Sequence, residues 1–450
     1  MRRPLSAVDA AWLRMEDPTN LMMVTGVLLF DGRLHPGKLR AVVEDRLLAF
    51  PRFRERIAEP PFGIGPPSWT TDGRFDLDAH VHHVALPEPG GKLALEAFVS
   101  DLMSTPLDTT KPLWQLHLVE HAAGSAIVSR VHHCIADGIA LIQVLLSLTD
   151  TSARPRRRRR GEAPALDGAA AGPPALLRAG GWLTQAGFGL VRDPGQAMRL
   201  AGFGADAAAT LARIALMPPD PQTSLKGRLG VTKRAAWSEP IPLAEVKAAG
   251  ARAGATVNDV LVSVTAGALG RYLAFRGDRI DGVDVRATVP VNLRPLDEAH
   301  RLGNRFGLVF LALPIGLTDP VVRVAEVKRR MDELKSSLQP AVALGVLNAI
   351  GYLPTALQPL PVGFFGSKAS AVLTNVPGPR QPIYLAGEPV RRAMFWVPQS
   401  GRLGLGISIL SYAGEVMVGV ASDAGLVPDP QAIVEGFHLE VEALLGSAAG

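Results

Sequence analysis

The stretch that decides the fold spans residues 126–148, AIVSRVHHCIADGIALIQVLLSL. Its first six residues are mostly apolar and β-branched, which predicts a strand entering a core. From Ile139 onward, apolar residues recur at helical spacing and predict a buried helix. Between the two elements lie His132, His133, Asp137 and Gly138, and Gly138 is expected to adopt a backbone conformation that most residues resist. A polar cluster between buried elements is costly unless its members are hydrogen-bonded or used, so this cluster is the candidate site.

The composition indicates a folded protein. The chain has 450 residues, of which 47% are hydrophobic and 20% charged, enough for two or three domains. Much of the net charge of +5 could come from residues 154–160 (RPRRRRR), so the overall charge does not indicate a nucleic-acid partner. The single cysteine, Cys134, excludes an intrachain disulfide and fits a cytoplasmic location. We find neither a signal-peptide pattern nor an apolar run of the roughly 18 residues that a spanning helix needs.

Helical and strand patterns interleave in two blocks of the chain. We therefore expect an α/β or α+β fold with domains at residues 1–150 and 230–450. Residues 151–229 are rich in arginine, proline, alanine and glycine, which predicts a crossover linker with weak helices. Residues 75–86 (FDLDAHVHHVAL) alternate and predict a strand. Their histidines are expected to be structural, because no Asp-Gly follows them at the required distance.

Several familiar catalytic motifs are absent. The sequence has no G-x-S-x-G, G-x-x-x-x-G-K-[ST], H-E-x-x-H or C-x-x-C, which weakens the hydrolase and zinc-protease interpretations. Adjacent histidines on a strand point to opposite faces, so His132 and His133 suit no shared ion, and no metal site is expected. For the same reason Cys134 is expected to be a buried, inert thiol. On spacing alone, two interpretations stay open: ordinary structural histidines, or one histidine acting as a general base while Asp137 holds the loop.

Residues 132–138 (HHCIADG) match the HHxxxDG motif of the CoA-dependent acyltransferase superfamily, which includes chloramphenicol acetyltransferase and peptide-synthetase condensation domains. More of the chain resembles the bacterial wax ester synthase/diacylglycerol acyltransferases. Pro112-Leu113-Trp114 resembles their PLW motif, and Asn258-Asp259 resembles their ND motif. Further similar segments occur in the same order at residues 5–16, 51–56, 290–295 (PVNLRP), 303–307 (GNRFG) and 374–379 (TNVPGP). The resemblance spans nearly the whole chain.

The resemblance implies a role for each matching residue. His133 would be the base that deprotonates an acceptor hydroxyl, which then attacks the acyl-CoA thioester without a covalent enzyme intermediate. His132 would support the loop, and Asn258 is a candidate donor to the oxyanion. Asp137 would be structural and orienting. A buried aspartate needs a counter-ion, and Arg294 is the predicted partner.

The resemblance also implies a fold and substrates. We expect two chloramphenicol-acetyltransferase-like domains with mixed sheets flanked by helices and an active-site tunnel between them. The donor would be a long-chain acyl-CoA, and the acceptor diacylglycerol, a long-chain alcohol, or both. No cofactor is expected, since acyl-CoA is a substrate. Residues predicted to contact substrate are Pro112, Leu113, Trp114, Gly138, Asn258 and Asp259, although Trp114 suits packing better.

Other interpretations are kept open. The apolar residues 257–273 and 341–353 could line a lipid channel, but core packing is the plainer interpretation for each residue. The basic run could hold the protein to an anionic inner-membrane face or a lipid droplet. The enzyme alternatives are acyl transfer or condensation from a carrier-bound donor. A catalytically silent lipid-binding or droplet protein is the remaining alternative, and the intact His133 and Asp137 count against it.

Overall fold

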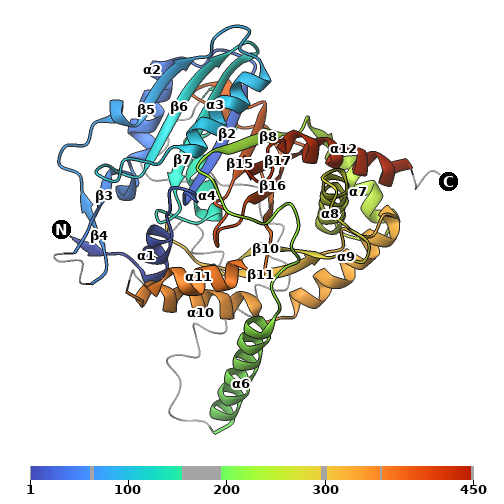
Figure 1. Cartoon of the computed structure of the whole chain (residues 1–450). Helices are drawn as coiled ribbons and strands as arrows, with labels where there is room; N and C mark the ends of the chain where they lie inside the picture. The colour runs from blue at the N-terminus through green and yellow to red at the C-terminus, as the bar shows by residue number, and fades with distance from the viewer. Residues whose placement is uncertain (1, 61–64, 155–193, 295–301, 355–356, 447–450) are drawn as a thin grey trace.

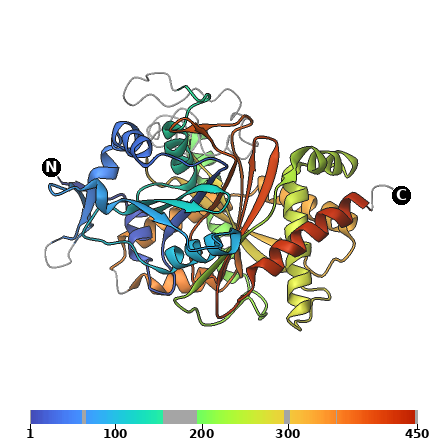
Figure 2. The same cartoon turned by 90° about the horizontal axis from the view of Figure 1, so that it is seen from above.

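The computed structural model describes residues 2–60, 65–154, 194–294, 302–354 and 357–446. An N-terminal half and a C-terminal half lie side by side, each built on a mixed sheet with helices against it (Figures 1 and 2). The predicted mixed α/β class is confirmed. The basic run lies outside the described residues except for Arg154.

The N-terminal half contains a five-stranded sheet in the order β15-β2-β7-β6-β5. Side chains alternate along its strands: Ile127 of β7 packs in the cluster with α2 and α4, whereas Val128 packs in the cluster with α3. Helices thus cover both faces of the sheet. The strands are β2 (Met23–Phe30), β5 (Val81–Ala85), β6 (Trp114–His121), β7 (Gly124–His132) and β15 (Arg392–Trp396). The helices are α2 (Pro36–Val42) with a π-helical turn (Val43–Leu47), α3 (Lys92–Ser104) and α4 (Gly138–Leu148).

One strand of this sheet comes from the other end of the chain. β15 pairs antiparallel with β2, with Arg392 opposite Leu29 and Trp396 opposite Thr25. Residues 230–450 therefore do not form a separate unit, because they complete the N-terminal sheet. The pairing of β15 with β2 joins the two halves through backbone hydrogen bonds.

The strand predicted over residues 75–86 is only partly present. A 3₁₀ turn (Leu77–Ala79) precedes the five-residue β5. The turn places the His80 ring between Phe75 and Trp114, with ring centroids 5.1 and 4.6 Å away. His80 is buried and its Nδ1 lies 2.8 Å from the Trp114 carbonyl oxygen, which gives this histidine a packing role.

The C-terminal half has a seven-stranded sheet in the order β11-β10-β12-β16-β17-β8, with β9 also paired to β17. Its strands are β8 (Lys233–Trp237), β9 (Ile241–Pro242), β10 (Val285–Asn292), β11 (Phe306–Leu313), β12 (Ala371–Pro377), β16 (Leu405–Tyr412) and β17 (Glu415–Asp423). The helices packed with it are α7 (Leu243–Arg252), α8 (Val257–Phe275), α9 (Pro320–Lys335) and α12 (Pro430–Gly446). Helix α8 is buried from Asp259 through Gly270 in this core. The suggestion that residues 257–273 line a channel is therefore wrong, since their apolar side chains serve core packing.

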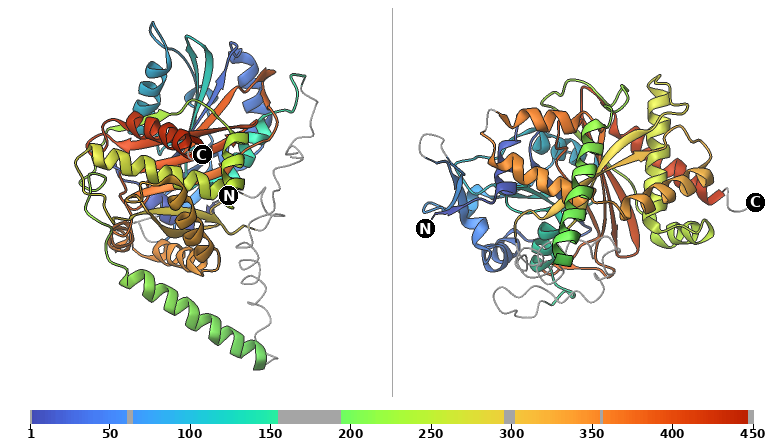
Figure 3. Two further views of the ribbon diagram at one scale, coloured as in Figure 1. Left: turned by 90° about the vertical axis from the view of Figure 1, so that its right-hand side faces the viewer. Right: turned by 90° about the horizontal axis from the view of Figure 1, so that it is seen from below.

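A third layer lies below the junction of the halves (Figure 1). It contains α1 (Ala7–Arg14), α10 (Gln339–Tyr352) and α11 (Pro359–Gly366). Within the crossover segment, α6 (Pro194–Leu216) projects away from the body, as Figure 3 shows. Among the described residues, no helix is both long and apolar enough to cross a bilayer. The remaining short strands are β1 (Arg3–Pro4), β3 (Glu55–Ala58), β4 (Ser68–Thr71), β13 (Tyr384–Leu385) and β14 (Glu388–Pro389).

The contact between α1 and α10 depends on one glycine, and this yields a stability prediction. A Cβ on Gly351 would lie 1.9 Å from the Ala7 carbonyl oxygen, so Gly351→Ala must separate the two helices. Overpacking of this kind costs about 1–3 kcal/mol, and urea unfolding should show that loss. Gly345→Ala in the same helix is the matched control: nothing lies within 4 Å of its Cβ, so stability should be unchanged or slightly higher. Equal stability of the two variants would contradict the packing described here.

Candidate active site

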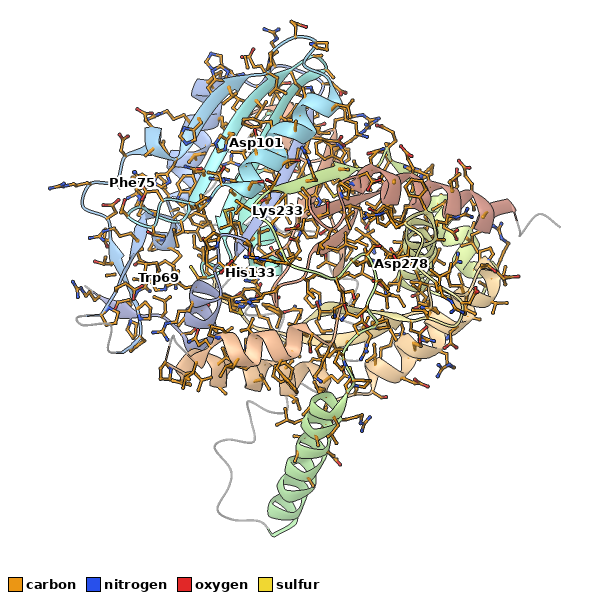
Figure 4. All side chains as sticks on the ribbon, in the orientation of Figure 1. Trp69, Phe75, Asp101, His133, Lys233 and Asp278 are labelled. Atoms are coloured by element: carbon orange, nitrogen blue, oxygen red, sulfur yellow. The ribbon has the colours of Figure 1, made fainter. Side chains whose placement is uncertain are left out.

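His133 lies where the two halves meet the α1 layer, immediately after β7 (Figure 4). Its side chain is buried, and its backbone N–H donates to the Met22 carbonyl oxygen at 2.8 Å. The imidazole stacks on the Trp12 indole with ring centroids 4.0 Å apart. Phe306 approaches another side at 5.5 Å. Aromatic walls of this kind orient the ring and exclude water.

The environment keeps the His133 imidazole neutral. Burial, with a smaller contribution from the neighbouring His132, lowers the pKa of His133 to about 3. The Asn304 side chain and the backbone carbonyl of His133 oppose this shift only in part. The ring is therefore unprotonated near neutral pH, which is the form that can accept a proton, while the same lowering of the pKa makes it a weaker base than an exposed histidine.

His132 points away from His133 toward a carboxylate. Its Nε2 lies 2.8 Å from Glu16 Oε2, and the Cys134 backbone N–H donates to Nδ1 at 3.1 Å. Because Nδ1 accepts the Cys134 N–H, a ring proton lies on Nε2 and donates to Glu16. Burial raises the pKa of the Glu16 carboxyl, but the hydrogen bond and charge of His132, the Met22 backbone N–H and the charge of Arg130 together lower it overall. The two histidines thus diverge as expected, and the Cys134 thiol is fully buried.

Asp137 ends the loop and begins α4. Its Oδ1 accepts the Ala140 backbone N–H at 2.9 Å, which caps the helix. Its Oδ2 accepts from Arg294 Nη2 at 2.7 Å and from the Arg305 backbone N–H at 2.9 Å. Asp137 and Arg294 are both buried, so the predicted partner lies in direct contact. The carboxylate is hydrogen-bonded at both oxygens, which is what a buried ion pair requires.

Residues 303–305 of the C-terminal half form hydrogen bonds with the loop that carries His133 and Asp137. The Gly303 carbonyl oxygen accepts the Asp137 N–H at 3.2 Å and Arg294 Nη2 at 2.6 Å. Asn304 Nδ2 donates to the His133 carbonyl oxygen and to Asp9 Oδ1, both at 2.8 Å. Hydrogen bonds from residues 303–304, together with Asp9 of α1, thus hold the loop after β7 in place.

Gly138 does not need special backbone freedom. It is the first residue of α4, and its φ is not positive, so that expectation is wrong. A Cβ at this position would have no atom within 4 Å. Open space beside the backbone at the start of α4 agrees with a predicted place for substrate, which stays a prediction.

The PLW residues lie behind the histidine strand. The Leu113 carbonyl oxygen accepts the His132 backbone N–H at 3.0 Å, and the buried Trp114 donates Nε1–H to the Phe53 carbonyl oxygen at 2.9 Å. Pro112 is buried beside them, and Leu113 and Trp114 pack in the N-terminal core. None of the three lines either large apolar cavity, so the geometry gives them a supporting role instead of the predicted substrate contact.

The ND residues begin α8. Asp259 and Thr256 form a reciprocal capping box, in which Asp259 Oδ2 accepts the Thr256 N–H at 2.9 Å. This contact makes Asp259 a helix cap. Asn258 Oδ1 accepts from Asn375 Nδ2 at 2.9 Å, and that bond orients the Asn258 amide with its Nδ2 as the remaining donor.

Two apolar cavities adjoin these elements. The first, about 710 Å³, extends from Trp12 between α10, α11 and the end of α6. Helix α10 contributes Val342, Val346 and Ile350, which agrees with the suggestion that residues 341–353 line a channel. The second, about 840 Å³, lies between β2, β7 and α4, with Ile142 and Leu145 in its wall. No charged residue lines either cavity, and among the described residues no group of three histidine, cysteine or acidic side chains is arranged to hold a metal ion.

Five residues around the loop have no place in the sequence-based prediction. Trp12 and Phe306 contact the His133 ring, Glu16 binds His132, Asn304 binds the loop, and Asn375 orients Asn258. All five fall in segments that resemble the family. Similarity marked those segments as important, but the part each side chain plays depends on contacts between distant segments.

The two mixed sheets and the HHxxxDG loop at their junction are the features that the resemblance to acyltransferases predicts. A sequence profile for the wax ester synthase/diacylglycerol acyltransferase catalytic domain matches residues 5–261, and one for the C-terminal domain of that family matches residues 302–444. The chain belongs to the wax ester synthase/diacylglycerol acyltransferase family, so it is an acyltransferase of that family.

Individual relatives agree along the whole chain. A Mycobacterium tuberculosis protein (strain CDC 1551 / Oshkosh) with the provisional name diacylglycerol O-acyltransferase is 30% identical, with 98% of this chain and 90% of the relative covered. The wax ester synthase/diacylglycerol acyltransferase of Marinobacter aquaeolei VT8 has the same fold, with a TM-score of 0.71, 22% identity and coverage of 99% and 100%. The starter condensation domain of rhizomide synthetase, solved with C8-CoA and Leu-SNAC, gives a TM-score of 0.62 at 13% identity, with coverage of 100% and 95%.

The Asp137–Arg294 pair can be separated from the helix cap by substitution. Asp137→Asn retains an oxygen that can cap α4 but removes the charge that compensates buried Arg294. Breaking a buried pair on one side costs about 3 kcal/mol or more in unfolding free energy, which urea titration measures. Asp319→Asn is the matched control, because Asp319 caps α9 at the surface and should tolerate the change within about 0.5 kcal/mol. Equal losses in the two variants would show that the ion pair does not brace the loop.

Proposed function

We propose that this protein transfers a long-chain acyl group from acyl-CoA to the hydroxyl of diacylglycerol, a long-chain alcohol, or both. One observation carries the proposal: a neutral, buried His133 stacks on Trp12, and Trp12 also lines a large apolar cavity. A base beside an apolar cavity suits a hydroxyl at the end of a lipid. Family membership supports acyl transfer as the chemistry.

The reaction needs one proton relay. His133 accepts the proton of the acceptor hydroxyl, and the hydroxyl oxygen attacks the thioester carbonyl carbon. When the tetrahedral intermediate collapses, the carbon–sulfur bond breaks, and the imidazolium returns its proton to the CoA thiolate. The buried Cys134 takes no part, so no acyl-enzyme forms. In this scheme Asp137, Arg294 and His132 position the loop and do not react.

The developing oxyanion needs a donor, and Asn258 is the proposed one. Its Oδ1 is already engaged by Asn375, which leaves Nδ2 as a preoriented donor. Asn375 belongs to β12, and the residues that follow it, Gly378 and Pro379, line the second cavity. The amide pair thus connects the start of α8 with the wall of that cavity.

The two cavities match the two chains of a lipid ester. Both are lined almost entirely by apolar side chains, as sites for lipid chains are. We assign the first cavity, which contains Trp12, to the acceptor. We assign the second, along β7 and α4, to the fatty acyl chain. Donors bound to carrier proteins are the main enzymatic alternative, and the condensation-domain fold is shared with them.

The experiment that tests the proposal measures thiol release from palmitoyl-CoA with hexadecanol or a diacylglycerol present. Release should depend on the acceptor and should fall by about 10²–10⁴-fold in His133→Ala, because the variant lacks the base. Cys134→Ala is the control, since a buried inert thiol should be dispensable. If palmitoyl-CoA releases no thiol with any acceptor, the result would favour acyl transfer from a carrier-bound donor or a protein without catalytic activity. Full activity in His133→Ala would exclude His133 as the base.

The pH profile offers an independent check. A histidine with an ordinary pKa of about 6.5 loses base activity tenfold per pH unit below that value. Because the pKa of His133 is lowered to about 3, the ring stays deprotonated as the pH falls, and kcat/KM should stay level from pH 8 to about 5. Steady-state rates with circular dichroism at each pH test this. A decline centred near pH 6.5 in folded protein would contradict the pKa assignment.

A further inference from the structure

The layer below the active site carries an unusual concentration of exposed apolar side chains. Twelve large hydrophobic residues of the described chain are exposed, and six of them lie on α10, α11, the link between them and the end of α6. We name these six the apolar rim: Leu211, Leu216, Tyr352, Leu357, Leu360 and Phe364. Tyr352 and Leu216 are 82% and 83% exposed, and the six residues together make an exposed apolar patch.

The rim residues come from elements that are adjacent in space. Lys368, two residues after α11, donates Nζ–H to the Ala215 carbonyl oxygen at 3.1 Å, and its ammonium lies 4.3 Å from the Phe364 ring centroid. Ile214 of α6 faces inward and lines the first cavity with Val362 of α11. Figures 1 and 3 show α6 leaving the body beside α10 and α11.

The charge pattern shows what kind of surface fits the rim. No residue between Lys335 and Lys368 is charged, although one residue in five of the whole chain is. Lys368 donates to α6, and Lys226 donates to the Ser367 and Ala369 oxygens at 2.8 and 3.0 Å. The exposed Arg213 lies between Leu211 and Leu216 on α6, where its long side chain can extend to the headgroups of a lipid layer. A protein-binding surface usually has a polar border with hydrogen-bonding groups. A mainly apolar surface with few such groups fits the acyl region of a lipid layer.

The same helices connect this outer surface with the candidate site. On α11, Leu360 and Phe364 face outward, whereas Val362 and Phe365 line the first cavity. That cavity reaches Trp12, which stacks on His133. An apolar molecule on the rim would thus reach the base along apolar walls.

We propose that the apolar rim docks the protein on a phospholipid surface and that the acceptor enters the first cavity directly from the lipid. The part concerning the acceptor rests on the proposed function, since diacylglycerols and long-chain alcohols reside in lipid phases. Docking is by apolar insertion, so it needs no anionic headgroup and resists salt. This differs from attachment through the basic run at residues 154–160.

Flotation with vesicles tests the docking. Wild-type protein should float with pure phosphatidylcholine vesicles, with little change between about 0.1 and 1 M NaCl, because salt screens charges and does not weaken apolar insertion. Tyr352→Glu combined with Leu360→Glu should weaken binding by at least tenfold, because both charges would enter the acyl layer. Leu93→Glu combined with Phe275→Glu is the matched control, since these side chains are 77% and 75% exposed on other faces.

Activity separates the docking from the reaction. With acceptor presented in vesicles, the rim variant should show a raised KM at unchanged kcat, whereas a short water-soluble alcohol should be acylated equally by both proteins. If the wild type acylates no acceptor, the proposed function is wrong. The flotation assay still tests the docking proposal in that case, because it does not depend on activity.

Several results would overturn the docking proposal. Wild-type protein that does not float, or floats only with phosphatidylglycerol and at low salt, would refute apolar insertion. A rim variant that floats like the wild type would refute this face. A wild-type dimer in solution that the rim variant loses would assign the rim to contact between two copies of the chain.

Discussion

Asp137 and Arg294 form a buried ion pair across the two halves of the chain, and the candidate site depends on it. A buried carboxylate is costly unless its oxygens are hydrogen-bonded. Here the helix cap, the guanidinium and the Arg305 backbone N–H meet that need together. The same carboxylate thus begins α4 and fixes the loop to the C-terminal half. The loop that carries His133 is therefore held by hydrogen bonds from both halves.

His132 and His133 have the same side chain but different surroundings, and the surroundings give them different roles. His132 has a carboxylate partner and a backbone donor, so both ring nitrogens are engaged. His133 has aromatic walls, and burial keeps it neutral. Trp12 links the His133 ring to the first cavity, because one residue contacts the ring and also lines that cavity. Packing of α1 against α10, which Gly351 permits, therefore bears on the base as well as on stability.

Much of this organisation could be predicted from the sequence. The strand, polar loop and helix at residues 126–148 follow from the sequence pattern. A short apolar run forms the mostly buried β7, and apolar residues at helical spacing form α4. The resemblance implied an arginine partner for Asp137, and the contact between Asp137 and Arg294 confirms that prediction. The pairing of β15 with the N-terminal sheet could not be predicted, since an alternating pattern does not reveal which sheet a strand joins. The apolar residues of α8 were ambiguous for a similar reason: core and channel walls have the same composition. Glu16, Trp12 and Asn304 act through contacts with residues more than a hundred positions away, which no local pattern contains.

The central claim is that His133 activates the acceptor for direct attack on the thioester. The most direct measurement is a single-turnover reaction with excess enzyme and labelled palmitoyl-CoA, followed by rapid quench and intact-mass analysis. Without acceptor, the account predicts no CoA burst and no acylated protein. With acceptor, CoA and labelled ester should form at the same rate. A stoichiometric burst of CoA with acyl-enzyme accumulating before ester would contradict the account, because it would require a nucleophile on the protein.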